Sequence, residues 1–208
     1  MLFFNSKIHY YLRTRGLLLV LGLLSVFLGV GSVLANPGLI AEKRKVTRVQ
    51  AVYLKHLINF THWDANDLPV PSKSAKVLLL GDNEGGMVET FEYLVSESKM
   101  KIGGRSVEVI HFEKPLAPDA IKAIESNPSV IFLLPKSNSQ AKKIRDLSPK
   151  SLLVGNGRDL VEKHKADIAF TVSKNRVRLV IREKSFTRKS PMLSSRISAL
   201  RNVVEVIP

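Results

Sequence analysis

The spacing of apolar residues predicts a helix over residues 46–63. This segment follows a long apolar run at the start of the chain. Apolar side chains recur at steps of three and four, while polar residues occupy the opposite face. The apolar stripe consists of Val46, Val49, Tyr53, Leu57 and Phe60, widened by Leu54 and Ile58. Residues 36–40 contain Pro37 and Gly38 and are expected to form a linker before the helix. Residues 64–74 contain two prolines and cannot continue it.

Short apolar runs then alternate with helical patterns. Buried strands are expected over 76–80 and 130–134, an alternating strand over 106–112 and a further strand over 151–154. Helices are expected over 86–96, 118–126 and 137–147. Strands that alternate with helices at this spacing imply parallel strands joined by helical crossovers. We therefore predict a three-layer α/β fold, in which a mainly parallel open sheet has helices on both faces.

The pattern changes near the C-terminus. Strands over 168–172 and 176–181 are separated by Ser173-Lys174-Asn175, which predicts an antiparallel hairpin at the end of the sheet. Lys174, Arg178 and Arg182 make this hairpin basic, and charge of this kind protects a sheet edge. A last helix is expected over 194–204, capped by Ser194 or Ser195, with Ile197, Leu200 and Val204 as its apolar stripe.

Residues 1–35 have the pattern of a secretory signal peptide. Lys7, Arg13 and Arg15 precede the apolar run 16–30, and Val33 and Ala35 place small residues before a cut ahead of Asn36. An uncleaved membrane anchor is the alternative, because the apolar run from 16 to 35 is near the roughly 20 residues that span a bilayer. In both cases the remainder, 36–208, is exported, and it is expected to form a single domain.

Composition narrows the possible chemistry. The chain of 208 residues has no cysteine, which excludes thiol catalysis, zinc–thiolate sites and iron–sulfur clusters. Its formal net charge of +14 could favour nucleic acid, an anionic membrane or an acidic partner. Export disfavours nucleic acid. The basic residues are scattered through every segment, which favours a solvated surface over a dedicated binding patch.

A search for motifs assigns no catalytic residue, metal ligand or cofactor. The loop from Gly81 to Gly86 lies between a strand and a helix, but it is neither a dinucleotide-binding glycine motif nor a Walker loop. A tight turn is the preferred interpretation, with Asp82 as a possible helix cap. His56 and His62 are six residues apart, which is not the spacing of a shared metal site. No GxSxG elbow is present.

Two groups of residues are candidates for binding. Phe60 and Trp63 end the first predicted helix, where they either pack in the core or dock a partner. The exposed aromatics or the basic hairpin, with Arg178 and Arg182, could form a partner surface or a homodimer contact. Open α/β sheets bind ligands at the carboxyl ends of their strands, so the ligand-edge candidates are Gly81, Asp82 and Asn156.

Three motifs, in the same order along the chain, resemble the YfiR-like family of exported bacterial envelope proteins. Family members open with a helix of the type ayLynFxkFveWP, which matches Ala51 to Trp63. A strand ending in Gly-Asp matches Val77 to Asp82, and a late Leu-x-Ile-Ser-Ser segment matches Met192 to Arg201. This chain departs from the family at Lys165-Ala166, where the family has Gly-Gly, at Ser198 and Arg201, and in lacking the cysteines of some relatives.

The resemblance implies a non-enzymatic periplasmic regulator. Such a protein would bind the outer portion of a membrane signalling protein, typically a diguanylate cyclase, and restrain it, with effects on cyclic di-GMP and biofilm formation. The family brings no catalytic residues. The alternative is a periplasmic small-molecule-binding protein or a component of an uptake system.

Overall fold

The computed structural model describes residues 37–173, 176–200 and 202–208. The predicted signal peptide, residues 1–35, therefore lies outside the described residues. The chain divides into two units at Leu39, and the second unit is Ile40–Pro208. The second unit carries the sheet, and it is the subject of the following description.

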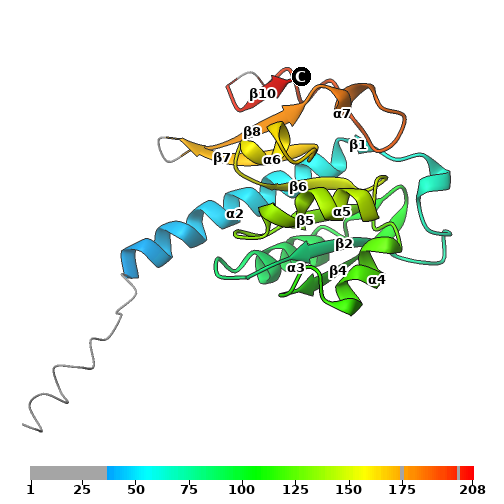
Figure 1. Cartoon of the computed structure of the whole chain (residues 1–208), viewed down its shortest axis with the longest axis horizontal. Helices are drawn as coiled ribbons and strands as arrows, with labels where there is room; N and C mark the ends of the chain where they lie inside the picture. Colours follow the sequence, from blue (N-terminus) through cyan, green and yellow to red (C-terminus); the bar gives the residue numbers. More distant parts are fainter. Residues whose placement is uncertain (1–36, 174–175, 201) are drawn as a thin grey trace, which may run out of the picture. The chain divides into compact units, whose positions relative to one another are not determined.

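An eight-stranded sheet with the order β10-β8-β7-β6-β5-β2-β4-β3 organises this unit (Figure 1). Its strands are β2 (Ala75–Leu80), β3 (Lys101–Ile102), β4 (Arg105–Phe112), β5 (Val130–Leu133), β6 (Leu152–Asn156), β7 (Ile168–Ser173), β8 (Arg176–Arg182) and β10 (Val204–Ile207). Strands β4, β2, β5, β6 and β7 are parallel neighbours. Strand β8 runs antiparallel to β7, so the predicted hairpin is confirmed.

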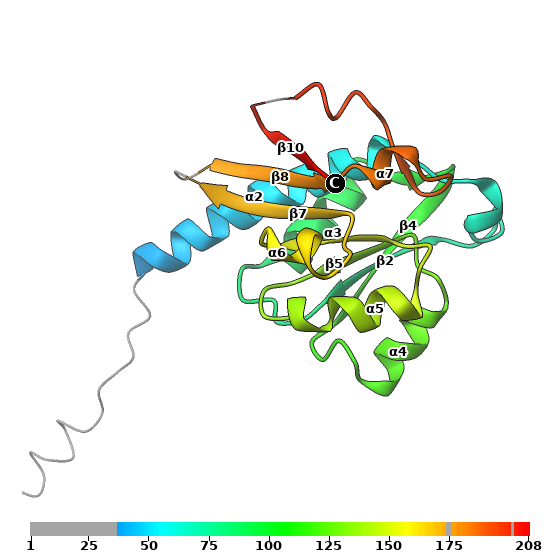
Figure 2. The same ribbon diagram turned by 45° about the horizontal axis from the view of Figure 1, so that its top comes forward.

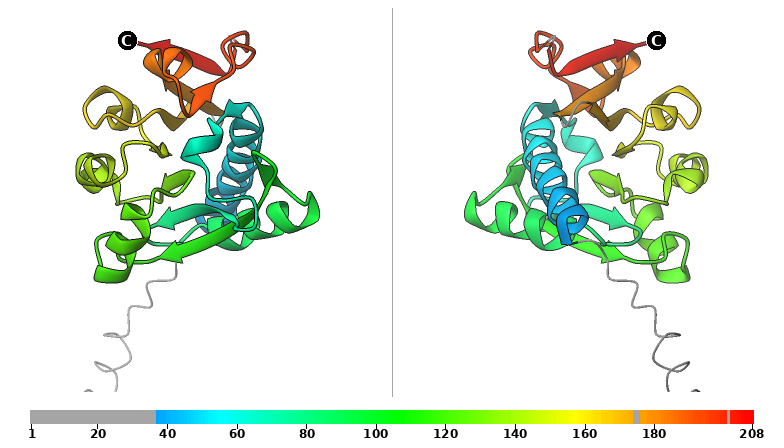
Figure 3. Two further views of the ribbon diagram at one scale, coloured as in Figure 1. Left: turned by 90° about the vertical axis from the view of Figure 1, so that its right-hand side faces the viewer. Right: turned by 90° about the vertical axis from the view of Figure 1, so that its left-hand side faces the viewer.

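Helices cover both faces of the sheet, as Figures 2 and 3 show. The helices are α2 (Pro37–Asn59), α3 (Met87–Glu97), α4 (Pro118–Glu125), α5 (Ala141–Leu147), α6 (Asp159–Glu162) and α7 (Lys184–Thr187). Helices α2 and α3 pack with one core cluster, whereas α4, α5 and α6 pack with another. In β2, Val77 and Leu79 enter the first cluster and Leu78 and Leu80 the second. This alternation is that of a strand buried on both faces, and the three-layer α/β prediction is confirmed.

The first helix differs from its prediction at both ends. It begins at Pro37, so residues 37–40 belong to its first turn and not to a linker. A proline is tolerated there because its missing N–H would have no partner within the helix. The helix ends at Asn59, and the two-residue strand β1 (Thr61–His62) pairs with β9 (Met192–Leu193). A short 3₁₀ turn, η1 (Ala65–Asp67), follows.

The buried face of α2 is rotated from the predicted stripe. Val49 is 37% exposed, whereas Gln50, Ala51 and Leu54 are buried. Gln50 is accepted in this interior position because its amide hydrogen-bonds to Asn156 on the sheet. The polar contact, which hydrophobic periodicity does not register, fixes the orientation of the helix.

The predicted helix over 194–204 is wrong. Turns occupy most of this segment, and β10 then pairs in parallel with β8, with Val204 opposite Leu179. Ile197 is buried, but Leu200 is 53% exposed. The reason is that the hairpin leaves the backbone of β8 unpaired on one side, and β10 fills those hydrogen bonds. The basic strand β8 is therefore not an edge strand; β10 is.

Candidate functional site

The two aromatic candidates at the end of α2 have different environments. Trp63 is 7% exposed and lies in the core cluster beneath α2. Phe60 is 40% exposed, and its carbonyl oxygen accepts a hydrogen bond of 2.9 Å from the Ser194 amide. The core interpretation therefore holds for Trp63, and Phe60 is the member of the pair that a partner could contact.

An apolar groove of about 670 Å³ lies between the first half of α2 and the C-terminal strands. Its apolar lining is Ala41, Val46, Val49, Tyr53, Val177 and Val203, and its polar lining is Glu42, Lys45, Arg176, Arg178 and Asn202. Arg176 and Arg178 flank Val177 in β8, so strand alternation directs their side chains to the face of the sheet opposite Val177. The groove thus combines an apolar floor with a lining in which cationic residues outnumber the one carboxylate.

The predicted pair Arg178 and Arg182 lies on one face of β8, but the two side chains differ in exposure. Arg178 is exposed and lines the groove. Arg182 is half-buried, and its guanidinium donates a hydrogen bond to the Val161 carbonyl oxygen. Burial lowers the pKa of Arg182, although Asp167 acts in the opposite direction. The two arginines therefore differ in environment: Arg178 is exposed, whereas Arg182 is held against α6.

Gly81 and Asp82 form the turn that leaves strand β2. Gly81 has a φ of +119°, and a Cβ there would lie 2.1 Å from the Ser137 hydroxyl, so glycine is required by both conformation and space. Asp82 forms a long ion pair of 3.6 Å with Lys136. It does not cap α3: the Asn83 side chain accepts a hydrogen bond of 3.0 Å from the Val88 amide instead.

Asn156 lies at the carboxyl end of β6 and is held by three other elements. It accepts a hydrogen bond of 2.8 Å from the Gln50 amide of α2 and donates one of 3.3 Å to the Leu133 carbonyl. Its own carbonyl oxygen accepts from the Asn138 side chain. Side chains of the protein thus occupy this part of the ligand edge, and ligand binding there stays a prediction.

Glu84, in the loop after Asp82, carries a strong electrostatic perturbation. Hydrogen bonds from Lys136 and Lys43 lower its pKa from 4.5 to about 2. All three side chains are solvent-exposed, and exposed ion pairs contribute little to folding. This cluster ties the start of α2 to the carboxyl edge of the sheet.

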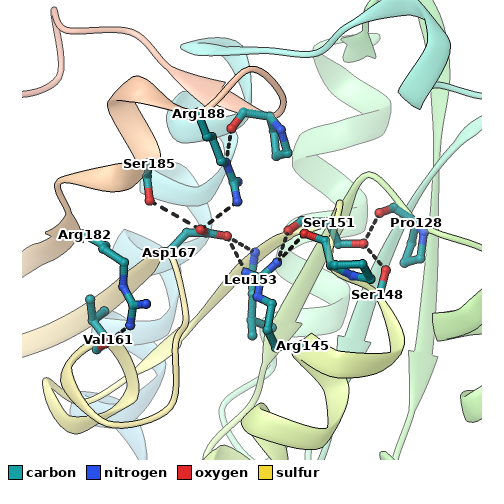
Figure 4. A network of polar contacts seen from close by, with 12 residues as sticks. Pro128, Arg145, Ser148, Ser151, Leu153, Val161, Asp167, Arg182, Ser185 and Arg188 are labelled. Atoms are coloured by element: carbon teal, nitrogen blue, oxygen red, sulfur yellow. Dashed lines mark hydrogen bonds and ion pairs between the residues drawn. The ribbon is translucent and has the colours of Figure 1, made fainter.

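Asp167, immediately before β7, is the centre of a buried polar network that no sequence motif predicted (Figure 4). One carboxylate oxygen accepts from Arg145 at 2.6 Å and from the Leu153 amide at 2.8 Å. The other lies 2.9 Å from an Arg188 nitrogen and 3.3 Å from the Ser185 hydroxyl. The one sequence signal for this network is the position of Asp167, an acidic residue immediately before the apolar run 168–170. Asp167 is buried together with that run.

Within the described ranges, no group of three His, Asp or Glu side chains is arranged to hold a metal ion. Likewise, no helix in the described part of the chain is both long and apolar enough to cross a bilayer.

Comparison with known proteins places the chain in a family. A family model described as YfiR/HmsC-like matches residues 47–200, which is more than half of the chain. The chain therefore belongs to the YfiR/HmsC-like family, and the resemblance carried by the sequence motifs is confirmed. A search of curated proteins gives no match.

Among solved structures, the fold is similar to the crystal structure of a conserved domain protein from Vibrio cholerae O1 biovar El Tor. The TM-score is 0.52 at 10% sequence identity, and the match covers 77% of this chain and 59% of the other. This chain thus matches less than two thirds of that protein. At this identity the likeness concerns the fold alone.

Proposed function

We propose that this protein is an exported regulator that binds the periplasmic part of a membrane signalling protein of the diguanylate cyclase type and restrains it. Membership of the YfiR/HmsC-like family over residues 47–200 carries the proposal, because that family consists of periplasmic regulators and not of catalysts. The predicted signal peptide agrees with this location. Cellular output would be lower cyclic di-GMP and less biofilm.

The groove beside α2 is the surface that we assign to the signalling protein. Val49 is 37% exposed and Val177 forms part of the same apolar floor. The charged residues of the lining are Lys45, Arg176 and Arg178 with Glu42, so positive charge is in excess around the groove. An apolar floor ringed by charge is the usual anatomy of an interface. The complementary segment on the partner is an apolar side chain flanked by acidic residues, since opposite charges at a rim accelerate association and set orientation.

Complementation of a deletion strain tests both the regulator and its surface. Deletion should raise cellular cyclic di-GMP, and the wild-type chain should restore the lower level. Val49→Asp should fail to restore it, because a carboxylate on the groove floor would be desolvated against an acidic partner. Val70→Asp is the matched control: Val70 is 57% exposed in the segment after η1 and does not line the groove.

Unchanged cyclic di-GMP on deletion would refute the regulatory function. Full complementation by Val49→Asp, at equal protein abundance, would refute the groove as the contact surface and leave the regulatory function standing. Light scattering on the purified protein completes the experiment. A dimer that Val49→Asp dissociates and Val70→Asp does not would assign the groove to a second copy of this chain.

A further inference from the structure

A second cavity, of about 250 Å³, lies next to the Asp167 network and has an excess of positive charge. It is lined by Arg145, Pro149, Lys165, Asp167, Arg182, Lys184 and Arg188. Five cationic side chains therefore surround one carboxylate. A cluster of one sign in a partly enclosed space attracts small ions of the opposite sign.

Asp167 does not neutralise this excess. Arg145 and the Leu153 amide occupy one of its oxygens, at 2.6 and 2.8 Å, and Arg188 occupies the other, at 2.9 Å. The negative charge of Asp167 is thus paired with the positive charges of Arg145 and Arg188, the two arginines that contact it. The charges of Arg182, Lys165 and Lys184 have no acidic counterpart in the cavity lining.

Two guanidinium nitrogens at this cavity are buried without an acceptor. Nε of Arg182 and Nη2 of Arg188 have no hydrogen-bond partner among the described residues. Burial lowers the pKa of both side chains, yet arginine stays charged in proteins. A buried N–H group without an acceptor is unfavourable. Both nitrogens are shielded from solvent, so an anion in the cavity would supply the missing acceptor only as the arginine side chains turn toward it.

The backbone presents a further cation at this cavity. Lys165 has a φ of +60°, in the left-handed region that non-glycine residues seldom adopt. The cost of this conformation is of the kind found at binding sites. The next residue, Ala166, is buried, whereas Lys165 is exposed and is one of the residues that line the cavity.

From these features we propose that the cavity bounded by Arg182, Arg188 and Lys165 binds a phosphate group, either inorganic phosphate or the phosphate of a small soluble ester. The donors come from β8, the α7 region and the turn before β7 (Figure 4 shows the two arginines on either side of Asp167). A tetrahedral dianion offers oxygens in all of these directions, whereas a carboxylate offers two on one side. Guanidinium groups match phosphate oxygens with strong, charge-assisted hydrogen bonds. The small volume favours a compact ligand.

Calorimetric titration of the full mature chain with inorganic phosphate, at constant ionic strength set with sodium chloride, tests the site. Saturable binding of one phosphate per chain is expected, with a rise in melting temperature that chloride at the same ionic strength does not produce. An equal rise with chloride, or no saturable heat, would overturn the proposal.

Arg182→Gln should weaken phosphate binding at least tenfold, because it removes a charged donor and leaves the Arg145 and Arg188 contacts to Asp167 intact. Arg196→Gln removes an exposed arginine outside the cavity and should leave the affinity unchanged. If Arg182→Gln does not fold, the double variant Lys165→Ser/Lys184→Gln replaces it, since both lysines are exposed. It too should weaken binding at least tenfold, and unchanged affinity would refute the assignment.

A third experiment distinguishes a soluble phosphate ligand from a lipid headgroup. Glycerol 3-phosphate should compete with inorganic phosphate for the site. Vesicles of phosphatidylcholine with 20% phosphatidic acid should not bind in an Arg182-dependent manner. Vesicle binding without any binding of the soluble ester would overturn the proposal in favour of a lipid headgroup. None of these outcomes bears on the regulatory function, which was assigned to the groove beside α2.

Discussion

Arg145 of α5 and Asp167, the residue before β7, form a buried ion pair in which a guanidinium nitrogen lies 2.6 Å from a carboxylate oxygen. Their side chains are 12% and 7% exposed. The same guanidinium donates to the Ser151 carbonyl at 2.8 Å. The pair therefore joins α5, the start of β6 and the start of β7, and it fixes the wall of the basic cavity.

Replacing Asp167 with Asn should strongly destabilise the fold. The substitution leaves Arg145 and Arg188 buried without their counter-charge, and breaking a buried pair in this way typically costs about 3–5 kcal/mol. Urea denaturation followed by circular dichroism measures the loss. Asp159→Asn is the control, because its pair with Lys163 is exposed and contributes less than about 1 kcal/mol. A loss below about 1 kcal/mol for Asp167→Asn would contradict the structural role of the network.

Trp63 and Phe60 should respond differently to replacement by alanine. Trp63 is buried in the core beneath α2, so Trp63→Ala should reduce the free energy of unfolding by about 3–5 kcal/mol. Phe60 is 40% exposed, and Phe60→Ala should cost less than about 1 kcal/mol. Chemical denaturation of both variants provides the comparison. Equal losses for the two would show that the environments assigned to them are wrong.

Gly81 and Gly104 form a pair that separates backbone strain from steric crowding. Both have positive φ angles, +119° and +85°, but a Cβ at Gly104 would meet nothing within 4 Å, whereas one at Gly81 would meet Ser137. Gly104→Ala should cost about 1 kcal/mol from strain alone. Gly81→Ala should cost at least about 1 kcal/mol more, because Ser137 must move. Thermal denaturation of the two variants tests this difference, and similar melting temperatures would argue against the close approach of Ser137.

Glu84 should titrate far below a normal glutamate. Lys136 and Lys43 lower its pKa from 4.5 to about 2, because both stabilise the carboxylate form. A folded-state pKa below the unfolded value means that the stabilisation is present above about pH 4.5 and is lost as the pH falls towards 2. Carboxyl-carbon NMR titration reads the midpoint directly.

Lys136→Gln should move the Glu84 midpoint upwards, and added salt should do the same because these groups are exposed. Lys122→Gln, an exposed substitution on α4, should leave the midpoint in place. A wild-type midpoint close to 4.5 would mean that the two lysines do not hold the carboxylate in solution.

Local pattern in the sequence was sufficient for the central strands and for the hairpin. Strands β2, β5 and β6 are buried on both faces and consist of short apolar runs. The hairpin is marked by its turn residues. Such signals depend on near neighbours in the chain, and for this reason the three-layer architecture and the mainly parallel direction of the strands could be predicted.

The candidate sites depended on contacts between distant segments. Asp167 forms ion pairs with Arg145 and Arg188, which lie about twenty residues before and after it in the chain. No local sequence pattern predicts contacts between residues so far apart. Arg182 was predicted on a solvated edge, but its proximity to α6 buries much of it. The groove beside α2 likewise exists because that helix lies next to residues 176–178 and 202–203.

The sequence by itself determined that the chain has an α/β fold, that its central strands are buried and parallel, and that no thiol chemistry is available. Tertiary structure decided which face of α2 is buried, because Gln50 finds Asn156 across the interface. It also decided that residues 204–207 form a strand, because the unpaired backbone of β8 offers hydrogen bonds that outweigh a local helical pattern. Tertiary contacts also decided the environment of Trp63, which follows the first helix. Strand β1, directly before Trp63, pairs with the distant strand β9, and Trp63 is buried in the core.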